Sequence, residues 1–387
     1  MKRRPYLRLL VFGCCVALAT VVNLSFIMEN VRRVEMETFE AEQIEVHESV
    51  TSRIPITLVI CKNTGDWVNV DKKNVRTSWK RQKQQFAVIF ASMLYFSKLS
   101  SIRIILLTDS VETYVELLST ISGWPQHQRR RLHFEMHNIE EERFKEGQLL
   151  QWRPCAWTKM YLPEMLEDFD ATIYMDSDVL FLGPVEDTWA VFQRMGDVAA
   201  IAASAEMWYL EEGNNRPAAG KYGINTGVMF MNLTRLRKIS LAENLMLYTD
   251  SDPAPRHDQD VLNAFLKYHP HLLHELPARY NFLPSSCQKS APVCQECLDR
   301  GILVMHGADS SFYRFVDAKM KMVFRVLLEV SFNFSASLEQ LVQRLEAGLV
   351  KLHKENHMYI YMCQHLPHYD LQLMRHARSL LASKISK

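Results

Sequence analysis

The first half of the chain alternates short apolar runs with stretches of helical period, and this alternation constrains the fold more than any other feature. Apolar runs of strand length occupy 54–60, 102–107, 132–136 and 171–175. The segments between these runs carry apolar residues at the spacing of one helix face. Strands that alternate with helices typically form a parallel sheet with helices on both faces. The sequence therefore predicts one large α/β domain.

The fourth of these runs ends in two carboxylates, Asp176 and Asp178, and a second apolar run follows them. On an extended chain, residues i and i+2 point to the same side. In open α/β sheets, ligands bind at the carboxyl ends of the strands. Two carboxylates within a buried run are costly unless they are paired or bind a metal ion. Their hard oxygens suit Mg²⁺ or Mn²⁺ carrying a diphosphate, which is how a glycosyltransferase holds a nucleotide-sugar. The other Asp-x-Asp triplets, at 168–170, 250–252 and 258–260, lack such flanks and fit solvated turns.

The N-terminus carries basic residues before an uncharged, apolar stretch that is long enough to span a bilayer as a helix. Positive flanks remain cytoplasmic, so we expect a single-pass type II protein of the Golgi or endoplasmic reticulum membrane with a lumenal body. A cleaved signal peptide is the alternative, because Ala17-Leu-Ala19 resembles a cleavage site. The expected parts are a cytoplasmic tail at 1–8, a signal-anchor helix at 9–28, a stem at 29–53, a catalytic domain at 54–330 and a helical segment at 331–387.

Charge and cysteine content narrow the class of protein further. Lys and Arg total 45 against 44 for Asp and Glu, so no basic excess indicates a nucleic-acid partner. Asn232 and Asn333 begin glycosylation sequons, which a lumenal body would expose to modification. Zinc is disfavoured, because no fourth ligand stands at an expected spacing from the cysteine cluster near residue 290. Six cysteines outside the anchor permit three disulfides of unassigned pairing: Cys61, Cys155, Cys287, Cys294, Cys297 and Cys363.

Further polar residues lie where apolar elements begin or end. His306 and Gly307 close an apolar strand, and among fourteen histidines His306 is the best candidate for a third metal ligand. Lys159 lies one helix before the aspartate pair, where its charge would neutralise phosphate oxygens. The alternatives are that His306 has only a structural role and that Lys159 is a solvated surface charge.

Two more segments combine polar groups with buried elements. Asn225 stands among small residues beside an apolar strand, where its amide would bond a sugar hydroxyl; the alternative is an ordinary turn. Asp258 and Gln259 open an apolar helix and would face the sugar ring, unless Asp258 only caps that helix. Further on, Ser337 and Gln340 predict the capping box of a C-terminal helix.

Together these segments resemble glycosyltransferase family 8, and within it the glucoside xylosyltransferases. The resemblance covers about residues 54–330 and is strongest from 150 to 310. The matching motifs occur in family order: Trp157-Thr-Lys159-Met-Tyr-Leu, Tyr174-Met-Asp176-Ser-Asp178, Ile224-Asn225-Thr-Gly227-Val-Met, Asp258-Gln-Asp260-Val-Leu-Asn263 and Val304-Met-His306-Gly307.

The resemblance implies a single Rossmann-like nucleotide-sugar transferase domain of the GT-A type, followed by C-terminal helices. It implies retaining transfer of xylose from UDP-α-D-xylose to O-linked glucose on EGF-like repeats, such as those of Notch-type receptors. Mn²⁺ or Mg²⁺ would be held by Asp176, Asp178 and His306. The donor would contact Lys159, Asn225, Asp176 and Gly307, and Asp258 and Gln259 would stabilise the positive charge that develops at C1.

The sequence departs from the family pattern at several positions, including Cys297 and the run Ser310-Ser-Phe-Tyr-Arg314, and two departures concern donor-binding segments. Lys62 follows Cys61 where the relatives carry glycine, which affects the base-binding loop. Lys159 stands where close relatives carry arginine, which keeps the charge but loses the planar fork. Two other functions stay open: a related UDP-glucose or UDP-galactose transferase, and a catalytically dead lumenal binding protein. Pentose and hexose donors differ in the room they need around C5, and the spacing of motifs in the sequence does not reveal the size of that pocket.

Overall fold

The computed structural model describes most of the chain after residue 54. The described residues are 55–62, 79–98, 101–139, 154–207, 215–251, 255, 257–288, 291–314, 316–332, 334–355, 363 and 366–385. The expected anchor at 9–28, the expected stem and the sequon at Asn333 lie outside these ranges. Among the described helices, none combines the length and apolar character that a bilayer span requires.

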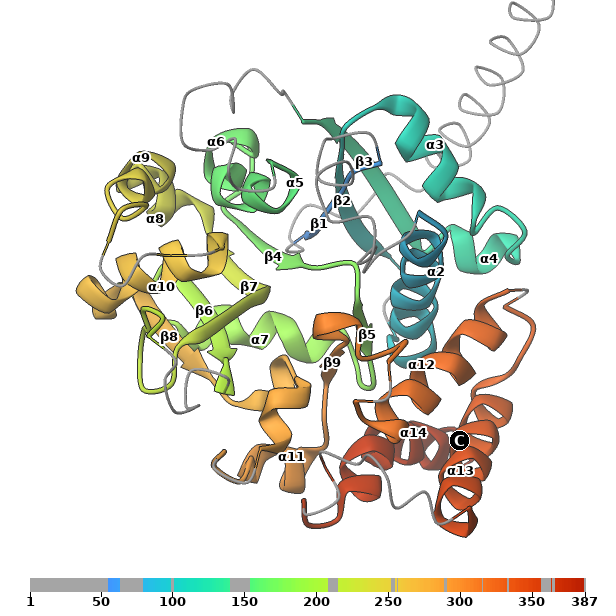
Figure 1. Cartoon of the computed structure of the whole chain (residues 1–387). Coiled ribbons are helices and arrows are strands. Elements are labelled where there is room, and N and C mark those ends of the chain that lie inside the picture. The colour runs from blue at the N-terminus through green and yellow to red at the C-terminus, as the bar shows by residue number, and fades with distance from the viewer. Residues whose placement is uncertain are drawn as a thin grey trace, which may run out of the picture. The chain divides into compact units, whose positions relative to one another are not determined.

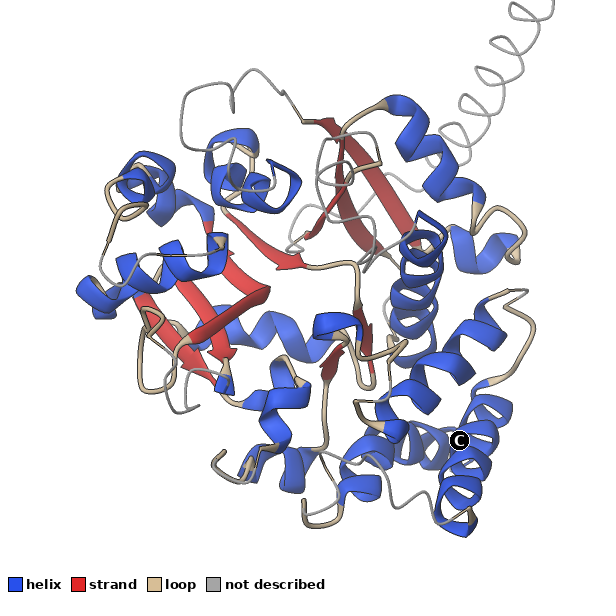
Figure 2. Ribbon diagram, viewed as in Figure 1, coloured by secondary structure: helices blue, strands red, loops and turns tan. Residues whose placement is uncertain are grey.

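A central sheet of seven strands, in the order β3-β2-β1-β4-β7-β6-β8, organises the domain (Figures 1 and 2). Strands β3, β2, β1 and β4 run parallel, as predicted. Strand β7 is antiparallel to both neighbours, and β8 pairs in parallel with β6. The strands are β1 (Ile56–Ile60), β2 (Ile102–Thr108), β3 (Leu132–Asn138), β4 (Ala171–Met175), β6 (Ile201–Ala205), β7 (Ile224–Asn232) and β8 (Leu273–Leu276).

The parallel arrangement predicted from the strand–helix alternation is confirmed for the first half of the sheet, whereas the second half is mixed. Parallel neighbours need a crossover connection, usually a helix, whereas antiparallel neighbours do not. The described residues between β6 and β7 form no α-helix, and the chain returns beside β6 in the opposite direction. The result is a mixed α/β architecture of the GT-A type with a central parallel region.

Helix α2 (Trp79–Phe96) covers one face of the parallel strands. Its predicted apolar stripe is buried, and Phe86 and Phe90 pack on Phe134 of β3 with ring centroids 6.0 and 5.1 Å apart. Helix α12 (Ala318–Ser331) packs against α2. Other helices lie around the sheet: α3 (Val111–Ser119), α4 (Gln126–Arg129), α7 (Glu186–Arg194), α8 (Leu233–Lys238), α9 (Leu241–Met246), α10 (Asp258–Tyr268) and α11 (Gln295–Arg300).

The segment of helical spacing before β4 is divided into three short pieces. They are α5 (Pro154–Trp157), the 3₁₀ helix η4 (Thr158–Tyr161) and α6 (Leu162–Met165). Pro163 lacks the N–H that a continuous helix would need at that position. The remaining 3₁₀ turns are η6 (Pro270–Leu272), η7 (Ala278–Tyr280), η8 (Pro284–Cys287) and η9 (Ala308–Ser310).

The C-terminal helices gather beside α2 and α12 (Figure 1). Helix α13 (Leu338–Lys354) begins with the predicted capping box: Ser337 Oγ accepts from the N–H of Gln340, and Gln340 accepts from the N–H of Ser337. Helix α14 (Tyr369–Ile385) follows. Its His376 lies against Gly183, which follows β5, and against Arg279 of η7, so α14 is joined to the core.

A small second sheet and three disulfides complete the scaffold. Strand β5 (Val179–Phe181) pairs antiparallel with β9 (Val304–His306), and Val179 is in register with His306. This pairing brings the turn that holds Asp176 and Asp178, here called the aspartate turn, beside the strand that carries His306. The expected three disulfides are confirmed, with the pairs Cys61–Cys155, Cys287–Cys363 and Cys294–Cys297. The cysteines near residue 290 are thereby all engaged in disulfides, which leaves no thiolate for zinc.

Candidate active site

The structure brings Asp176, Asp178 and His306 together where β4 ends. The two aspartates lie in the turn between β4 and β5, rather than on extended chain as expected. His306 Nε2 is 3.2 Å from Asp178 Oδ1 and 3.9 Å from Asp176 Oδ2. One ligand atom from each residue lies within 4.8 Å of the others. Two carboxylate oxygens and one imidazole nitrogen at this spacing fit Mn²⁺ or Mg²⁺ with coordination positions left for phosphate oxygens.

Negative charge dominates this group. Burial works to lower the pKa of His306, but the charge of Asp178, the hydrogen bond to it and the charge of Asp176 outweigh burial and raise it. Burial likewise works to raise the pKa of Asp178, but the neighbouring imidazole holds it below its usual value. The Asp178 carboxylate is therefore ionised, and a divalent cation beside it would replace the charge that the imidazole supplies.

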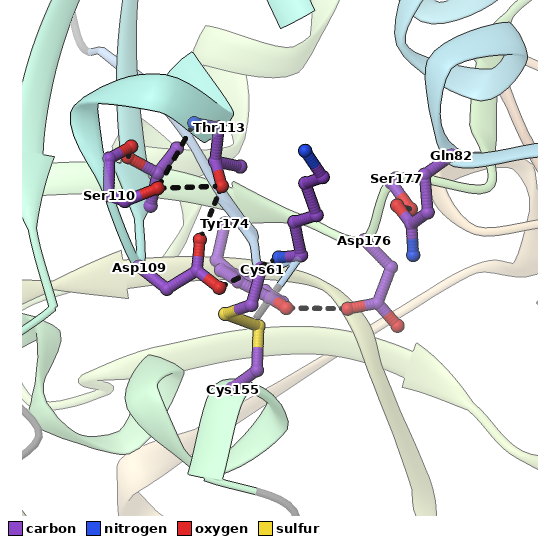
Figure 3. Close-up of a disulfide and its surroundings, with 11 residues drawn as sticks. Cys61, Gln82, Asp109, Ser110, Thr113, Cys155, Tyr174, Asp176 and Ser177 are labelled. Carbon is purple, nitrogen blue, oxygen red and sulfur yellow. Dashed lines mark hydrogen bonds between the residues drawn. A yellow bond between two sulfur atoms is a disulfide. The ribbon is translucent and has the colours of Figure 1, made fainter. Parts of the chain in front are cut away.

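Tyr174 orients Asp176 from within β4 (Figure 3). The Tyr174 hydroxyl donates to Asp176 Oδ1 at 2.5 Å. Burial, followed by the charge of Asp176, raises the pKa of Tyr174 well above its ordinary value, so the phenol stays a neutral donor. The backbone N–H of Asp176 donates to the Gly227 carbonyl at 2.8 Å. Ser177 donates to Gln82 of α2 at 3.0 Å, which fixes the middle of the turn.

Lys159 lies in a buried ion pair instead of standing free. Its Nζ is 2.7 Å from Asp258 Oδ2 and donates to Thr226 Oγ1 at 3.0 Å. The same Nζ lies 5.3 Å from the centre of the Tyr174 ring. Burial works to lower the pKa of Lys159, but the charges of Asp258 and then Asp176 raise it, so the lysine stays charged. This pair therefore joins η4 to the start of α10.

The first turn of α10 faces β7. His257 occupies the N-cap and Asp258 the first helical position, so the capping alternative for Asp258 does not hold. Gln259 Oε1 accepts from the N–H of Thr226 at 3.1 Å. These contacts place Asp258 and Gln259 beside the Lys159 ammonium, in the same site as the aspartate turn.

Asn225 and Gly307 also border the site. The Asn225 amide is buried and bonds protein groups: its oxygen accepts from the N–H of Gly227 at 2.9 Å, and its nitrogen donates to Glu206 at 2.8 Å. The N–H of Gly307 donates to the Asp178 carbonyl at 2.7 Å. A Cβ on Gly307 would lie 2.3 Å from the Phe312 ring, so the position requires glycine.

The carboxyl ends of β1 and β2 lie at the same edge of the sheet. The N–H of Lys62 donates to Asp109 Oδ2 at 2.8 Å, and Asp109 Oδ1 accepts from Thr113 at 2.6 Å. The Cys61–Cys155 disulfide ties the end of β1 to α5 next to Tyr174 (Figure 3). The residue that departs from the family pattern, Lys62, is thus anchored through its backbone to Asp109.

Sequence reasoning missed the residues that support this site from behind. Tyr174 stands within a quoted motif, and its position two residues before Asp176 was the available signal. Asn281 lies in the segment Tyr280-Asn-Phe, which also resembles the glucoside xylosyltransferases. Glu206 follows a strand without any motif, so nothing in its local sequence marks it.

Residues 86–306 match the family model described as glycosyl transferase family 8. The match covers more than half of the chain, and the chain belongs to this family.

The chain is also similar to individual proteins. Glucoside xylosyltransferase 1 of Danio rerio is 30% identical over 269 residues, 63% of this chain and 64% of the relative. Glucoside xylosyltransferase 2 of Xenopus laevis is 29% identical over 233 residues, 54% of each chain. The alignments thus span between about half and two thirds of these curated relatives. The apo structure of mouse xyloside xylosyltransferase 1 aligns with a TM-score of 0.47 and 16% identity, over 66% of this chain and 97% of that one.

Proposed function

We propose that the chain is a retaining xylosyltransferase that moves xylose from UDP-α-D-xylose to O-linked glucose on EGF-like repeats. The observation that carries the proposal is the meeting of Asp176, Asp178 and His306 beside the Lys159–Asp258 ion pair. The choice of sugar rests on the relatives named glucoside xylosyltransferase. In the proposed setting the catalytic domain is lumenal in the Golgi or endoplasmic reticulum, anchored by residues 9–28.

One set of residues acts on the diphosphate leaving group, and another acts on the sugar. Asp176, Asp178 and His306 would hold Mn²⁺ or Mg²⁺, which when bound acts as a Lewis acid toward the diphosphate. Lys159 adds a fixed positive charge that reaches both the aspartate pair and Asp258.

Asp258 and Gln259 act on the other side of the scissile bond. Positive charge develops at C1 of the sugar during glycosyl transfer, and oriented carboxylate and amide oxygens stabilise it. The Lys159 ion pair and the bond from Thr226 hold these two side chains in place beforehand. Such preorganisation is what makes electrostatic stabilisation effective in an active site.

A donor and acceptor panel tests the proposal. The full chain is incubated with Mn²⁺ and UDP-xylose, UDP-glucose or UDP-galactose, on an O-glucosylated EGF repeat and on the bare repeat. We expect a pentose on the O-glucose with retained α configuration, and no product on the bare repeat. If pocket atoms occupy the position of the hexose C6, hexose donors are excluded sterically. If the pocket merely lacks contacts to C6, it discriminates between pentose and hexose donors by only about 10–200-fold.

Each other outcome has a defined meaning. Equal transfer of glucose, or transfer to the bare repeat, removes the xylosyltransferase assignment. Failure to hydrolyse or transfer any donor favours the binding-protein alternative. Asp178→Asn serves as the inactive control, so that product formed by contaminating enzymes is recognised.

A further inference from the structure

A buried chain of polar side chains leads from Glu206 to His306 behind the aspartate turn. Glu206 Oε2 accepts from Asn225 Nδ2 at 2.8 Å. Asn225 Oδ1 in turn accepts from Asn281 Nδ2 at 2.9 Å, and Asn281 Oδ1 lies 3.0 Å from His306 Nδ1. All four residues are buried, as is Ser285, which donates to the other Glu206 oxygen at 2.7 Å. The proposed transfer reaction assigns no role to Glu206 or Asn281.

The backbone sets the direction of this chain. The N–H of Gly227 donates to Asn225 Oδ1 at 2.9 Å. A backbone N–H can only donate, so the oxygen of Asn225, and not its nitrogen, must face Gly227. The amide nitrogen then faces Glu206 Oε2, which accepts from it. The orientation of the Asn225 amide is therefore fixed by the backbone of Gly227.

That orientation determines which ring nitrogen of His306 carries a proton. Because Asn225 Oδ1 can only accept, Asn281 must turn its NH₂ toward Asn225 and its oxygen toward His306. An acceptor opposite Nδ1 requires a proton on Nδ1. In the neutral ring, Nε2 then carries the lone pair, and Nε2 is the atom nearest Asp178 Oδ1.

We propose that Glu206, Asn225 and Asn281 are positioning residues that hold His306 in the Nδ1–H tautomer and so present Nε2 to a divalent cation. The inference rests on the proposed function only in taking His306 as a metal ligand. A neutral ring with its proton on Nε2 would point an N–H at the cation and could not bind it. Outer partners of this kind typically contribute 10–100-fold to metal affinity.

The tautomer can be observed directly in the unmodified protein. The full chain is labelled with ¹⁵N-histidine, and His306 is assigned by difference from His306→Gln. At alkaline pH, where the ring is neutral, ¹⁵N–¹H correlation should show the proton on Nδ1. Adding diamagnetic Mg²⁺ should shift the Nε2 resonance and leave Nδ1 protonated. A proton on Nε2 of the neutral ring would overturn the proposal.

Metal binding by variants supplies a second readout, with Mn²⁺ alone as the probe and electron paramagnetic resonance of free Mn²⁺ as the measurement. Asn281→Leu removes the acceptor and should weaken binding about 10–100-fold. Asn281→Asp keeps an oxygen opposite Nδ1 but turns a second acceptor toward Asn225 Oδ1, so it should lose clearly less affinity than Asn281→Leu without matching wild type. The matched control Asn244→Ala removes a side-chain hydrogen bond from α9 to the Ile239 carbonyl, and should bind Mn²⁺ normally.

Thermal melting shows that each variant is folded. Wild-type Mn²⁺ affinity in folded Asn281→Leu, or equal losses in the Leu and Asp variants, would show that Asn281 only packs and would overturn the proposal. Neither readout uses a donor sugar or an acceptor repeat. A chain that does not transfer xylose and a His306 ring protonated on Nε2 are therefore distinguishable results.

Discussion

Gly227 lies so close to His306 that a Cβ built on the glycine would sit 2.1 Å from Cε1 of the imidazole and 2.9 Å from Asp176 Oδ2. Contacts this short force the imidazole or the carboxylate to move. The glycine is therefore part of the metal site through the space it leaves and through its two backbone hydrogen bonds, to Asn225 and to Asp176.

We predict that Gly227→Ala abolishes metal-dependent transfer while the chain still folds. Overpacking of this kind typically costs about 1–3 kcal/mol of stability. The displaced imidazole should also lower Mn²⁺ affinity, measured by titration. Gly123→Ala is the matched control, because a Cβ there meets no atom within 4 Å. Normal activity in Gly227→Ala would mean that His306 is not needed where it lies.

Removing a metal ligand should be more severe than removing an outer partner. We expect Asp178→Asn to reduce kcat/KM at least about 100-fold, beyond the 10–100-fold range of outer-shell changes. Excess chelator should abolish transfer by the wild-type chain, and added Mn²⁺ should restore it. Full activity in chelator would exclude a metal-dependent mechanism.

The Lys159–Asp258 pair should contribute to stability and activity in separable ways. Lys159→Met leaves a mostly buried Asp258 without its countercharge, which should cost about 3 kcal/mol of unfolding free energy. Lys159→Met combined with Asp258→Asn should recover most of that loss, because no lone charge remains, but not the activity. The exposed pair Arg378–Glu346 gives the comparison, since Arg378→Met should cost at most about 1 kcal/mol.

Chemical denaturation followed by fluorescence measures these stabilities, and the transfer assay measures the activity. If the double variant recovers both, the pair is only a structural contact. If it recovers neither, the two residues are not coupled as the 2.7 Å contact indicates.

His376 should make the junction between α14 and the core sensitive to acid. Burial, and next the charge of Arg279, lower the pKa of His376 to about 4. Because the unfolded chain then binds a proton that the folded chain does not, stability is full above about pH 6.5 and falls as the pH drops toward 4. The drop from the ordinary value of 6.5 corresponds to at most about 3 kcal/mol.

His376→Gln keeps an acceptor for Arg279, which lies 3.2 Å from His376 Nε2. We expect the melting temperature of this variant to fall less between pH 7 and pH 4.5 than that of wild type. The exposed His127→Gln serves as the control for loss of a histidine. Parallel melting curves for His376→Gln and wild type would show that His376 does not titrate in this range.

The elements with a strong local signal were predictable from sequence. Apolar runs located β1, β2 and β4, because strands of a parallel sheet are buried on both faces. The capping box located the start of α13. Strand direction in the second half was not encoded locally, since the apolar runs of β6 and β7 read the same either way. The edge strand β8, with the sequence LHEL, is too short and too polar to be found by this criterion.

The candidate site was predictable only in its charged groups. The charged groups each begin, interrupt or end an apolar element, which makes them visible in the sequence: Asp176, Asp178, His306, Lys159 and Asp258. The ion pair between Lys159 and Asp258 was not visible, because it joins residues 99 positions apart through tertiary contact. Supporting amides have no such signature, because a buried asparagine is recognised only by what surrounds it.

The Cys287–Cys363 disulfide closes a covalent ring that contains β9, α11, α12 and α13. A protease that cuts the backbone once inside this ring cannot release a fragment. A nicked molecule would therefore migrate as one band on a non-reducing gel and as two after reduction. The disulfide would also keep His306 tethered next to Asp176 and Asp178 after cleavage, so a nicked enzyme can retain activity in an oxidising compartment. Where the disulfide is reduced, that protection is lost.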